Sequence, residues 1–302
     1  MKQVCCFRSP RFPALSGATA RAHCTGFSET CVNSIDMARK VVRALHLKKL
    51  IFAGTNACAR ISPRRLCTRE GIRYQVDLRE VIDQGIWLYG WEPSTIALMK
   101  RHTSPGDTVI EVGANVGAHT LLLAKLVGPS GTVHAFEPTA YAQGKLRANV
   151  DLNPDLKARV VIRSELVTNH AGQTPVRRIT SSFAVRPNES RPAEVVHTAA
   201  IALDYEPFDR VNLLKIDVDG YDFKVLEGAT ELLKKFRPYV LIELYEWALA
   251  AQGDSVRDIF GLLRSLGYSG IYENGTPIVS AEEILAKVGT TLSVNGFFSP
   301  QT

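Results

Sequence analysis

The amino-acid sequence predicts an α/β fold in which a mostly parallel sheet carries helices on both faces. From residue 108 onward, short runs rich in Val, Ile and Leu alternate with longer segments of helical periodicity. The first apolar run, at 108–112, leads through a turn with two glycines into a helical segment. Acidic residues follow several of the runs, where parallel strands usually bind their ligands. We therefore expect a ligand at the carboxyl edge of this sheet.

Strands and helices are expected to alternate along this part of the chain. The predicted strands cover 108–112, 132–136, 159–163, 212–217, 239–243, 268–273 and 291–298. The predicted helices cover 117–127, 139–152, 221–235 and 254–266. Between these elements, the stretch 164–208 is irregular, and we interpret it as a region that faces the substrate.

Upstream of the sheet, residues 72–78 alternate like a strand, and Pro93 begins a predicted helix that runs to about residue 102. Residues 81–91 hold several large side chains and two glycines, which we interpret as a lid. Trp87, Trp91 and Glu92 could close over a ligand, with hydrophobic packing as the alternative for the two tryptophans. We divide the chain into a leader at 1–36, a lid segment at 37–104 and a ligand-binding domain at 105–302.

The positive charge of the chain is concentrated before the predicted sheet. The net charge is +6, and residues 1–70 contain 13 Lys and Arg against 3 Asp and Glu, which leaves 23 against 27 in the remainder. Since the body is mildly acidic, we expect no nucleic-acid partner. No apolar run reaches the roughly 18 residues that would span a bilayer.

The N-terminal stretch permits three interpretations: a disordered tail, a targeting peptide, or translated sequence upstream of a start at Met37. Residues 37–52 read as a basic amphipathic helix that packs on its own domain or makes weak contact with a membrane surface. All six cysteines lie at or before Cys67, without the spacing of a zinc site. We expect free thiols in a reducing compartment, and hence a cytoplasmic protein.

The turn after the first strand indicates the kind of ligand. Gly113 and Gly117 let the backbone approach a ligand closely, and the helix that follows offers free N–H groups. Glu111 would repel a diphosphate but attract an ammonium or sulfonium group, as in S-adenosylmethionine. Glu137, twenty residues after Gly117 and at the end of the next strand, is suited to accept hydrogen bonds from both hydroxyls of a ribose.

Four segments together resemble the FkbM family of S-adenosylmethionine-dependent methyltransferases. They are Val109-Ile-Glu-Val-Gly-Ala-Asn-Val-Gly117, His134-Ala-Phe-Glu-Pro138, Leu214-Lys-Ile-Asp-Val-Asp-Gly220 with Leu226-Glu-Gly-Ala229, and Arg237-Pro-Tyr-Val-Leu-Ile-Glu243. The resemblance implies a class I, Rossmann-like fold with seven strands and an antiparallel last pairing. It also implies O-methylation of a hydroxyl on a small molecule, such as a sugar, a glycolipid or a secondary metabolite. The family often has Glu at the positions of Asp219 and Asp222, and this chain keeps the charge with a shorter side chain.

The candidate cofactor residues follow the first three strands. We expect Gly113, Ala114, Asn115 and Gly117 to lie under the methionine part, Glu111 near its ammonium group, Glu137 and Pro138 at the ribose, and Ser164 and Glu165 at the adenine. Each has a purely structural alternative, such as a tight turn, a helix cap or a loop.

The candidate catalytic residues are Asp217, Asp219 and Glu243. Asp217 and Asp219 are two residues apart and share a face while the strand continues, although Asp219 could instead cap the next helix. Three acids at adjacent strand ends are costly unless they meet a cation or substrate donors. Asp217 is a candidate base or orienting group, and Asp217 with Glu243 could alternatively bind Mg²⁺.

Other residues and functions remain open at this stage. His134 is expected in the core, whereas His119, beside the glycine turn, could be structural or catalytic. A nicotinamide-dependent oxidoreductase is disfavoured by Glu111 and by Asn115 at a fingerprint glycine position. A partner subunit that binds the cofactor without catalysis is disfavoured by the intact acids.

Overall fold

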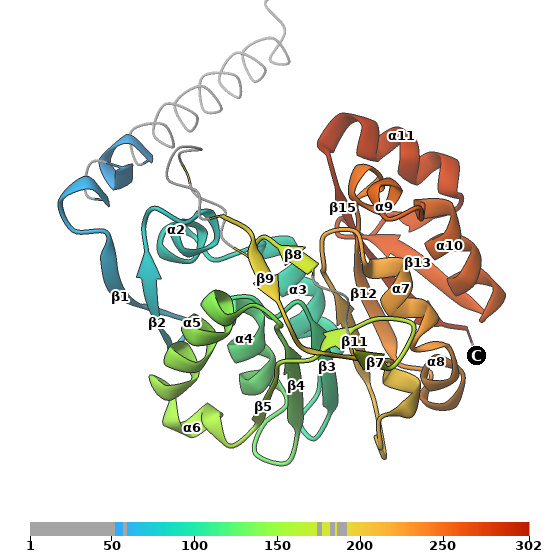
Figure 1. Cartoon of the computed structure of the whole chain (residues 1–302), viewed down its shortest axis with the longest axis horizontal. Coiled ribbons are helices and arrows are strands. Elements are labelled where there is room, and N and C mark those ends of the chain that lie inside the picture. The colour runs from blue at the N-terminus through green and yellow to red at the C-terminus, as the bar shows by residue number, and fades with distance from the viewer. Residues whose placement is uncertain (1–51, 57–58, 174–176, 182–184, 186–191, 302) are drawn as a thin grey trace, which may run out of the picture. The chain divides into compact units, whose positions relative to one another are not determined.

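The computed structural model describes residues 52–56, 59–173, 177–181, 185 and 192–301 (Figure 1). The described residues from Gly54 onward belong to one compact unit. The predicted leader and nearly all of the predicted helix at 37–52 lie outside the described residues. No described helix combines the length and the apolar character needed to cross a membrane.

The central sheet confirms the predicted seven strands and adds an eighth. Its strands are β3 (Thr108–Val112), β4 (Thr132–Phe136), β5 (Val160–Arg163), β11 (Leu213–Ile216), β12 (Tyr239–Leu244), β13 (Tyr268–Tyr272), β14 (Pro277–Ile278) and β15 (Val294–Pro300). Their spatial order is β14-β13-β15-β12-β11-β3-β4-β5. The run from β12 to β5 is parallel, while β15 lies antiparallel between β12 and β13 as expected. The extra strand, β14, is a two-residue hairpin partner of β13 at the edge.

Helices cover both faces of this sheet, as predicted. They are α2 (Val81–Leu88), α3 (Pro93–His102), α4 (Ala118–Leu126), α5 (Ala140–Asp151), α6 (Pro154–Lys157), α7 (Asp222–Glu227), α8 (Thr230–Phe236), α9 (Glu246–Ala251), α10 (Val256–Ser265) and α11 (Ala281–Thr291). In Figure 1, α4, α5 and α6 gather beside β3 to β5, and α7, α8 and α10 lie beside the strands of the C-terminal half.

The alternation of side chains along the strands divides the core into two clusters. Ile110 and Leu214 point to the face covered by α7, α8 and α10. Val109 and Leu213 point to the opposite face, which α3, α4 and α5 cover. Because the period of a strand is two, Glu111 shares the α4 face with Val109. This places charged side chains beside the first turn of α4.

Three predicted elements differ from the structure. The helix expected at 221–235 is broken into α7 and α8 around Gly228. Another segment approaches the backbone closely there: a Cβ on Gly228 would stand 2.1 Å from the Thr168 carbonyl oxygen, and the Gly228 carbonyl oxygen accepts the N–H of Asp204 at 2.9 Å. The lid segment at 81–91 contains a regular helix, α2, although Gly85 lies within it. The last strand begins at Val294 rather than 291, because α11 extends to Thr291.

The irregular stretch 164–208 contains short strands, as expected, but they form sheets of their own. They are β6 (Leu166–Val167), β7 (Gly172–Gln173), β8 (Arg177–Ile179), β9 (Glu194–Val196) and β10 (Ala199–Ile201). β8 pairs with β9, and β10 lies between β6 and β7. Upstream, β1 (Arg64–Arg69) and β2 (Ile72–Asp77) form a hairpin. Its inner face packs into the hydrophobic cluster on the side of the sheet that α3, α4 and α5 cover.

Candidate active site

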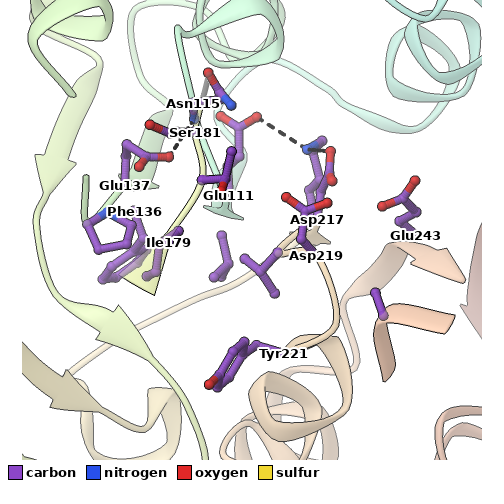
Figure 2. Close-up of a pocket in the computed structure, with 18 of the residues that line it drawn as sticks. Glu111, Asn115, Phe136, Glu137, Ile179, Ser181, Asp217, Asp219, Tyr221 and Glu243 are labelled. Carbon is purple, nitrogen blue, oxygen red and sulfur yellow. Dashed lines mark hydrogen bonds and ion pairs between the residues drawn. The ribbon is translucent and has the colours of Figure 1, made fainter. Parts of the chain in front are cut away.

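A cavity of about 1060 Å³ opens at the carboxyl ends of β3, β4, β11 and β12. Figure 2 shows Asn115 and Glu137 on one side and Glu243 on the other, with Asp217 and Asp219 between them. We call the two sides the Glu137 end and the Glu243 end. The predicted residues that line the cavity are Glu111, Gly113, Ala114, Asn115, Glu137, Pro138, Glu165, Asp217, Asp219 and Glu243. Gly117 and Ser164 do not line it.

The glycine turn is held tightly between neighbouring strand ends. The N–H groups of Gly113 and Ala114 both donate to the Phe136 carbonyl oxygen at 3.0 Å. Gly113 has φ of 89°, and a Cβ on it would lie 1.9 Å from the Asp217 carbonyl oxygen. Only glycine fits there, and the turn brings the ends of β3, β4 and β11 to one point.

Gly117 supports the turn by packing. It precedes α4 with φ of 85°, and a Cβ there would meet the side chain of Leu146 at 2.6 Å. Its contacts explain the need for glycine without a ligand.

Glu137 is buried and is held by three donors. Thr139 donates its N–H and hydroxyl to Oε1 at 2.9 and 2.5 Å, and the N–H of Asn115 donates to Oε2 at 3.0 Å. Burial raises the pKa of Glu137, and these hydrogen bonds oppose the shift. Since each carboxylate oxygen accepts two hydrogen bonds, Oε2 keeps capacity for a ligand hydroxyl. The side-chain oxygen of Asn115 is also buried, with no hydrogen-bond partner among the described residues.

Beyond Glu137, the lining is mostly apolar. Phe136, Pro138, Leu166 and Ile179 line this part of the cavity together with Ser181. Figure 2 shows Ile179 and Ser181 on the same side as Glu137. Sequence reasoning missed both residues, because they come from the irregular stretch, where no motif marks them.

The two residues predicted for the adenine are placed differently from each other. Glu165 lines the cavity, but its carboxylate accepts two donors from Arg163, at 2.7 and 3.0 Å, and Arg163 lowers its pKa. Ser164 is exposed, and its carbonyl oxygen accepts the hydroxyl of Thr198 at 2.9 Å. The carboxylate at this position is therefore occupied by a protein partner.

A buried lysine that sequence reasoning passed over organises the centre of the cavity. Lys215 is 3% exposed, and its Nζ lies 3.1 Å from Asp217 Oδ2 and 3.7 Å from Glu111 Oε1. Lys215 is paired with Glu111 across β11 and β3, so both project from the same level of the sheet. Burial would lower the pKa of Lys215, but the surrounding carboxylates outweigh burial and raise it. Protonated Lys215 thus supplies the positive charge that neighbouring acids require.

Glu111 is engaged by protein groups on both sides. The hydroxyl of Thr120 donates to its Oε2 at 2.6 Å, and Lys215 faces its other oxygen. Burial raises the pKa of Glu111 to about 7, while Lys215 and Thr120 pull the value down. Glu111 therefore has its main effect on the cavity by holding the Lys215 ammonium group in place. A lysine in the middle of the apolar run 213–216 was the available signal, because such a lysine needs an acid on the next strand.

The Glu243 end gathers the three predicted catalytic acids. Asp217 directly follows β11 and lines the cavity. Asp219 has φ of 49°, and its side chain is accessible from the cavity. Surrounding protein still desolvates Asp219 and raises its pKa. Asp222 is buried and accepts the N–H groups of Val218 and Gly220, so it stabilises the turn.

Glu243 ends β12 and is half-buried. The hydroxyl of Ser293 donates to its Oε1 at 2.6 Å. Burial and the nearby charge of Asp217 raise the pKa of Glu243 to about 8. Its second oxygen is left to face the cavity, so the ionised form of Glu243, which predominates above about pH 8, can accept a proton.

Glu92 and His119 complete this end from the α3 and α4 side. Glu92 precedes α3 with φ of 49°, and its Oε2 lies 3.9 Å from His119 Nε2. Burial raises the pKa of Glu92 to about 7 and lowers that of His119 to about 3, so the imidazole is neutral. Nε2 of His119 is buried and has no hydrogen-bond partner among the described residues. The sequence left His119 open, and its place in the cavity lining favours a functional role.

The predicted Mg²⁺ site remains a prediction. Within the described ranges, no group of three or more His, Cys, Asp or Glu side chains is arranged to hold a metal ion. Near Asp217, the neighbouring positive charge is that of Lys215.

Comparison with known proteins identifies the family. The family model for the methyltransferase FkbM domain matches residues 111–269, just over half of the chain. The chain is similar to the 31-O-demethyl-FK506 methyltransferase FkbM of Streptomyces tacrolimicus, with 27% identity over 217 residues, covering 60% of this chain and 79% of the relative. It is also similar to the hexuronic acid methyltransferase AglP of Haloferax volcanii, with 22% identity over 161 residues, covering 51% of this chain and 62% of the relative.

Among solved structures, the chain is similar to a methyltransferase FkbM from Methylobacillus flagellatus, with 14% identity and a TM-score of 0.45. That match covers 65% of this chain and 44% of the other, so this chain spans less than half of that protein. The match of the family model over residues 111–269 contains the glycine turn, Glu137, Lys215 and the three predicted catalytic acids Asp217, Asp219 and Glu243. The chain belongs to the FkbM family of S-adenosylmethionine-dependent methyltransferases.

Proposed function

We propose that this protein transfers a methyl group from S-adenosylmethionine to a hydroxyl group of a small molecule. One observation carries the proposal: the glycine turn with Glu137 and the acids Asp217, Asp219 and Glu243 line the same cavity. A site for the donor and a site for proton removal are thereby adjacent. The two curated relatives act, by their names, on an oxygen of FK506 and on a hexuronic acid, which supports a small hydroxyl-bearing acceptor.

The Glu137 end has groups that fit S-adenosylmethionine. Glu137 Oε2 has capacity for a ribose hydroxyl, and the unpartnered oxygen of Asn115 can accept a further donor. Gly113 lets the turn pack against the end of β11, and Phe136 and Ile179 offer apolar surface for a base. When bound, the cofactor supplies a methyl group on a positively charged sulfonium. The acidic lining favours that charge.

The Glu243 end has groups that would orient the acceptor and receive its proton. Methyl transfer is a displacement, so the acceptor oxygen must be aligned with the methyl group and water kept away. Asp217, fixed by Lys215 at 3.1 Å, orients the hydroxyl. Glu243, whose pKa is raised to about 8, takes the proton, and Asp219 holds a neighbouring hydroxyl.

Calorimetric titration of the full chain tests the donor half of this proposal. We expect S-adenosylmethionine and S-adenosylhomocysteine to bind and NAD not to bind. Glu137→Gln should weaken cofactor binding about tenfold to a hundredfold, since hydrogen bonds to a charged group contribute about 1.5–3 kcal/mol. Glu231→Gln, at an exposed ion pair with Lys234, is the matched control and should bind like the wild type.

Three further outcomes would change the proposal. Binding of NAD instead of the sulfur cofactors, or unchanged affinity in Glu137→Gln, would contradict it. Cofactor binding with no methyl transfer to any hydroxyl acceptor would favour a non-catalytic partner subunit. Repeating the transfer assay with a chelator and with added Mg²⁺ tests the metal hypothesis for Asp217 and Glu243, because a metal-assisted reaction would be lost on chelation.

A further inference from the structure

The charge of the acceptor is the next property that the cavity determines. We infer that the acceptor is uncharged around the hydroxyl that is methylated, and that the Glu243 end rejects acceptors that carry a carboxylate or phosphate there. This inference rests on the proposed function and names the class of its acceptor: a neutral, hydroxyl-rich molecule with an apolar face.

The first support is the balance of charge. Four carboxyl groups line this part of the cavity, from Glu92, Asp217, Asp219 and Glu243. Among the described residues that line the cavity, Lys215 is the single Lys or Arg. Lys215 is already placed between Glu111 and Asp217, so it has no unshared charge for an anionic ligand. A carboxylate or phosphate that enters here meets the acids of a partly desolvated site, and the repulsion grows as pH rises through the pKa of Glu92, about 7, and of Glu243, about 8.

The second support is the balance of hydrogen bonding. Asp219 accepts no hydrogen bond from any described residue, and Glu243 is bonded at one oxygen by Ser293. Nε2 of His119 is buried without a hydrogen-bond partner among the described residues, and it can accept a donor in the neutral tautomer that carries the proton on Nδ1. These groups need donors from the ligand. Hydroxyl groups donate, whereas an ionised carboxylate or phosphate has no proton to donate.

The third support is the mouth of the cavity beside Glu243. Trp247 lines it and is 75% exposed, and its ring centroid lies 6.1 Å from that of Tyr245. Leu292, which is 74% exposed, lines the same mouth. Exposed aromatic and apolar side chains at a carboxyl-lined cavity suit a ligand with donors on its edge and an apolar face.

A pair of probes that differ in one group tests the inference. Phenyl β-D-glucopyranoside and phenyl β-D-glucuronide share a ring and a phenyl group, but only the second carries a carboxylate. Their binding to the full chain, loaded with S-adenosylhomocysteine, is measured by saturation-transfer NMR titration. At low salt and above about pH 8, where Glu92 and Glu243 are ionised, we expect the neutral glucoside to bind about tenfold tighter or more, because like charges oppose the glucuronide. The preference should shrink as salt rises, since salt screens charge.

Variants assign the preference to the Glu243 end. The double variant Glu92→Gln with Glu243→Gln should reduce the preference by improving glucuronide binding, while Glu282→Gln, an exposed residue outside the cavity, should leave it unchanged. Glucuronide binding as tight as or tighter than glucoside binding, or binding of neither probe, would overturn the inference. Affinity for S-adenosylhomocysteine is measured first, so its absence marks a failure of the proposed function and not of the acceptor class.

Discussion

The carboxyl groups at the two ends of the cavity differ in how many hydrogen bonds they accept from the protein. At the Glu137 end, Glu137 accepts donors from Thr139 and Asn115, and Glu165 is held by Arg163. At the Glu243 end, Asp219 accepts no donor from the described part of the chain, and Glu243 accepts one. A carboxylate that the protein already holds is fixed in place for one ligand geometry. A carboxylate with spare capacity is available to different donors.

This contrast distinguishes the end of the cavity that binds the cofactor from the end that selects the acceptor. The polar contacts at Glu137 come from residues close in sequence, around two strand ends and one turn, although Ile179 and Ser181 of the irregular stretch also line this end. The Glu243 end draws on α3, α4, β11, β12 and the segment after α11, which meet only in the folded chain. We expect the first end to be sensitive to backbone changes and the second to be sensitive to charge.

The largest expected effect is that of Gly113→Ala. The added methyl group would lie 1.9 Å from the Asp217 carbonyl oxygen, at a residue with φ of 89°. The turn must therefore move, and cofactor binding measured by calorimetry should be lost together with several kcal/mol of stability. Gly144→Ala is the matched control, because Gly144 lies in α5 with nothing within 4 Å of the added Cβ. That control should be neutral or more stable, and equal behaviour of the two variants would refute this account of the turn.

The next largest effect is expected when the positive charge of Lys215, at the centre of the cavity, is removed. Lys215→Met leaves Glu111 and Asp217 without their counter-charge, and breaking a buried pair costs about 3–5 kcal/mol of unfolding free energy. Adding Glu111→Gln should recover part of that loss in chemical denaturation. Lys234→Met, at an exposed pair with Glu231, should change stability by less than about 1 kcal/mol. A double variant no more stable than Lys215→Met would show that the two residues do not interact.

A smaller effect is expected in the dependence of stability on pH. The pKa of Glu243 is raised to about 8 and those of Glu92 and Glu111 to about 7, so each contributes stability at low pH that is lost as pH rises through these values. The melting temperature of the ligand-free protein should fall as pH rises from about 5 to above 8. Glu243→Gln should melt higher than the wild type at the alkaline end and alike at the acidic end. A parallel decline in both proteins would remove Glu243 from this explanation.

The smallest effect on stability is expected for Trp247→Ala. The side chain is 75% exposed, so the melting temperature and cofactor affinity should hardly change, whereas binding of the phenyl glucoside should weaken. Tyr205→Ala, an aromatic residue that is 77% exposed outside the cavity lining, should change neither. Equal glucoside binding by the Trp247 variant and the wild type would place the acceptor elsewhere.

The sequence predicted the Glu137 end better than the Glu243 end, for a physical reason. The strands at 108–112 and 132–136 were predicted with their observed bounds, because apolar runs and a glycine turn are local signals. Lys215 was not recognised as a site residue, and Glu92 was named only as part of a lid. Their contacts join strands and helices that are far apart in the chain. The break between α7 and α8 was also missed, and there the backbone of Gly228 contacts Thr168 and Asp204, which are distant in sequence.

The most direct test is a crystal structure of the full chain with S-adenosylhomocysteine. We expect the ribose hydroxyls to lie within hydrogen-bonding distance of Glu137 and the amino-acid part to lie beside Gly113. We expect the sulfur atom to be directed toward Asp217 and Glu243. A cofactor that lies with its ribose at the Glu243 end, or outside this cavity, would contradict the division of the cavity into a cofactor end and an acceptor end.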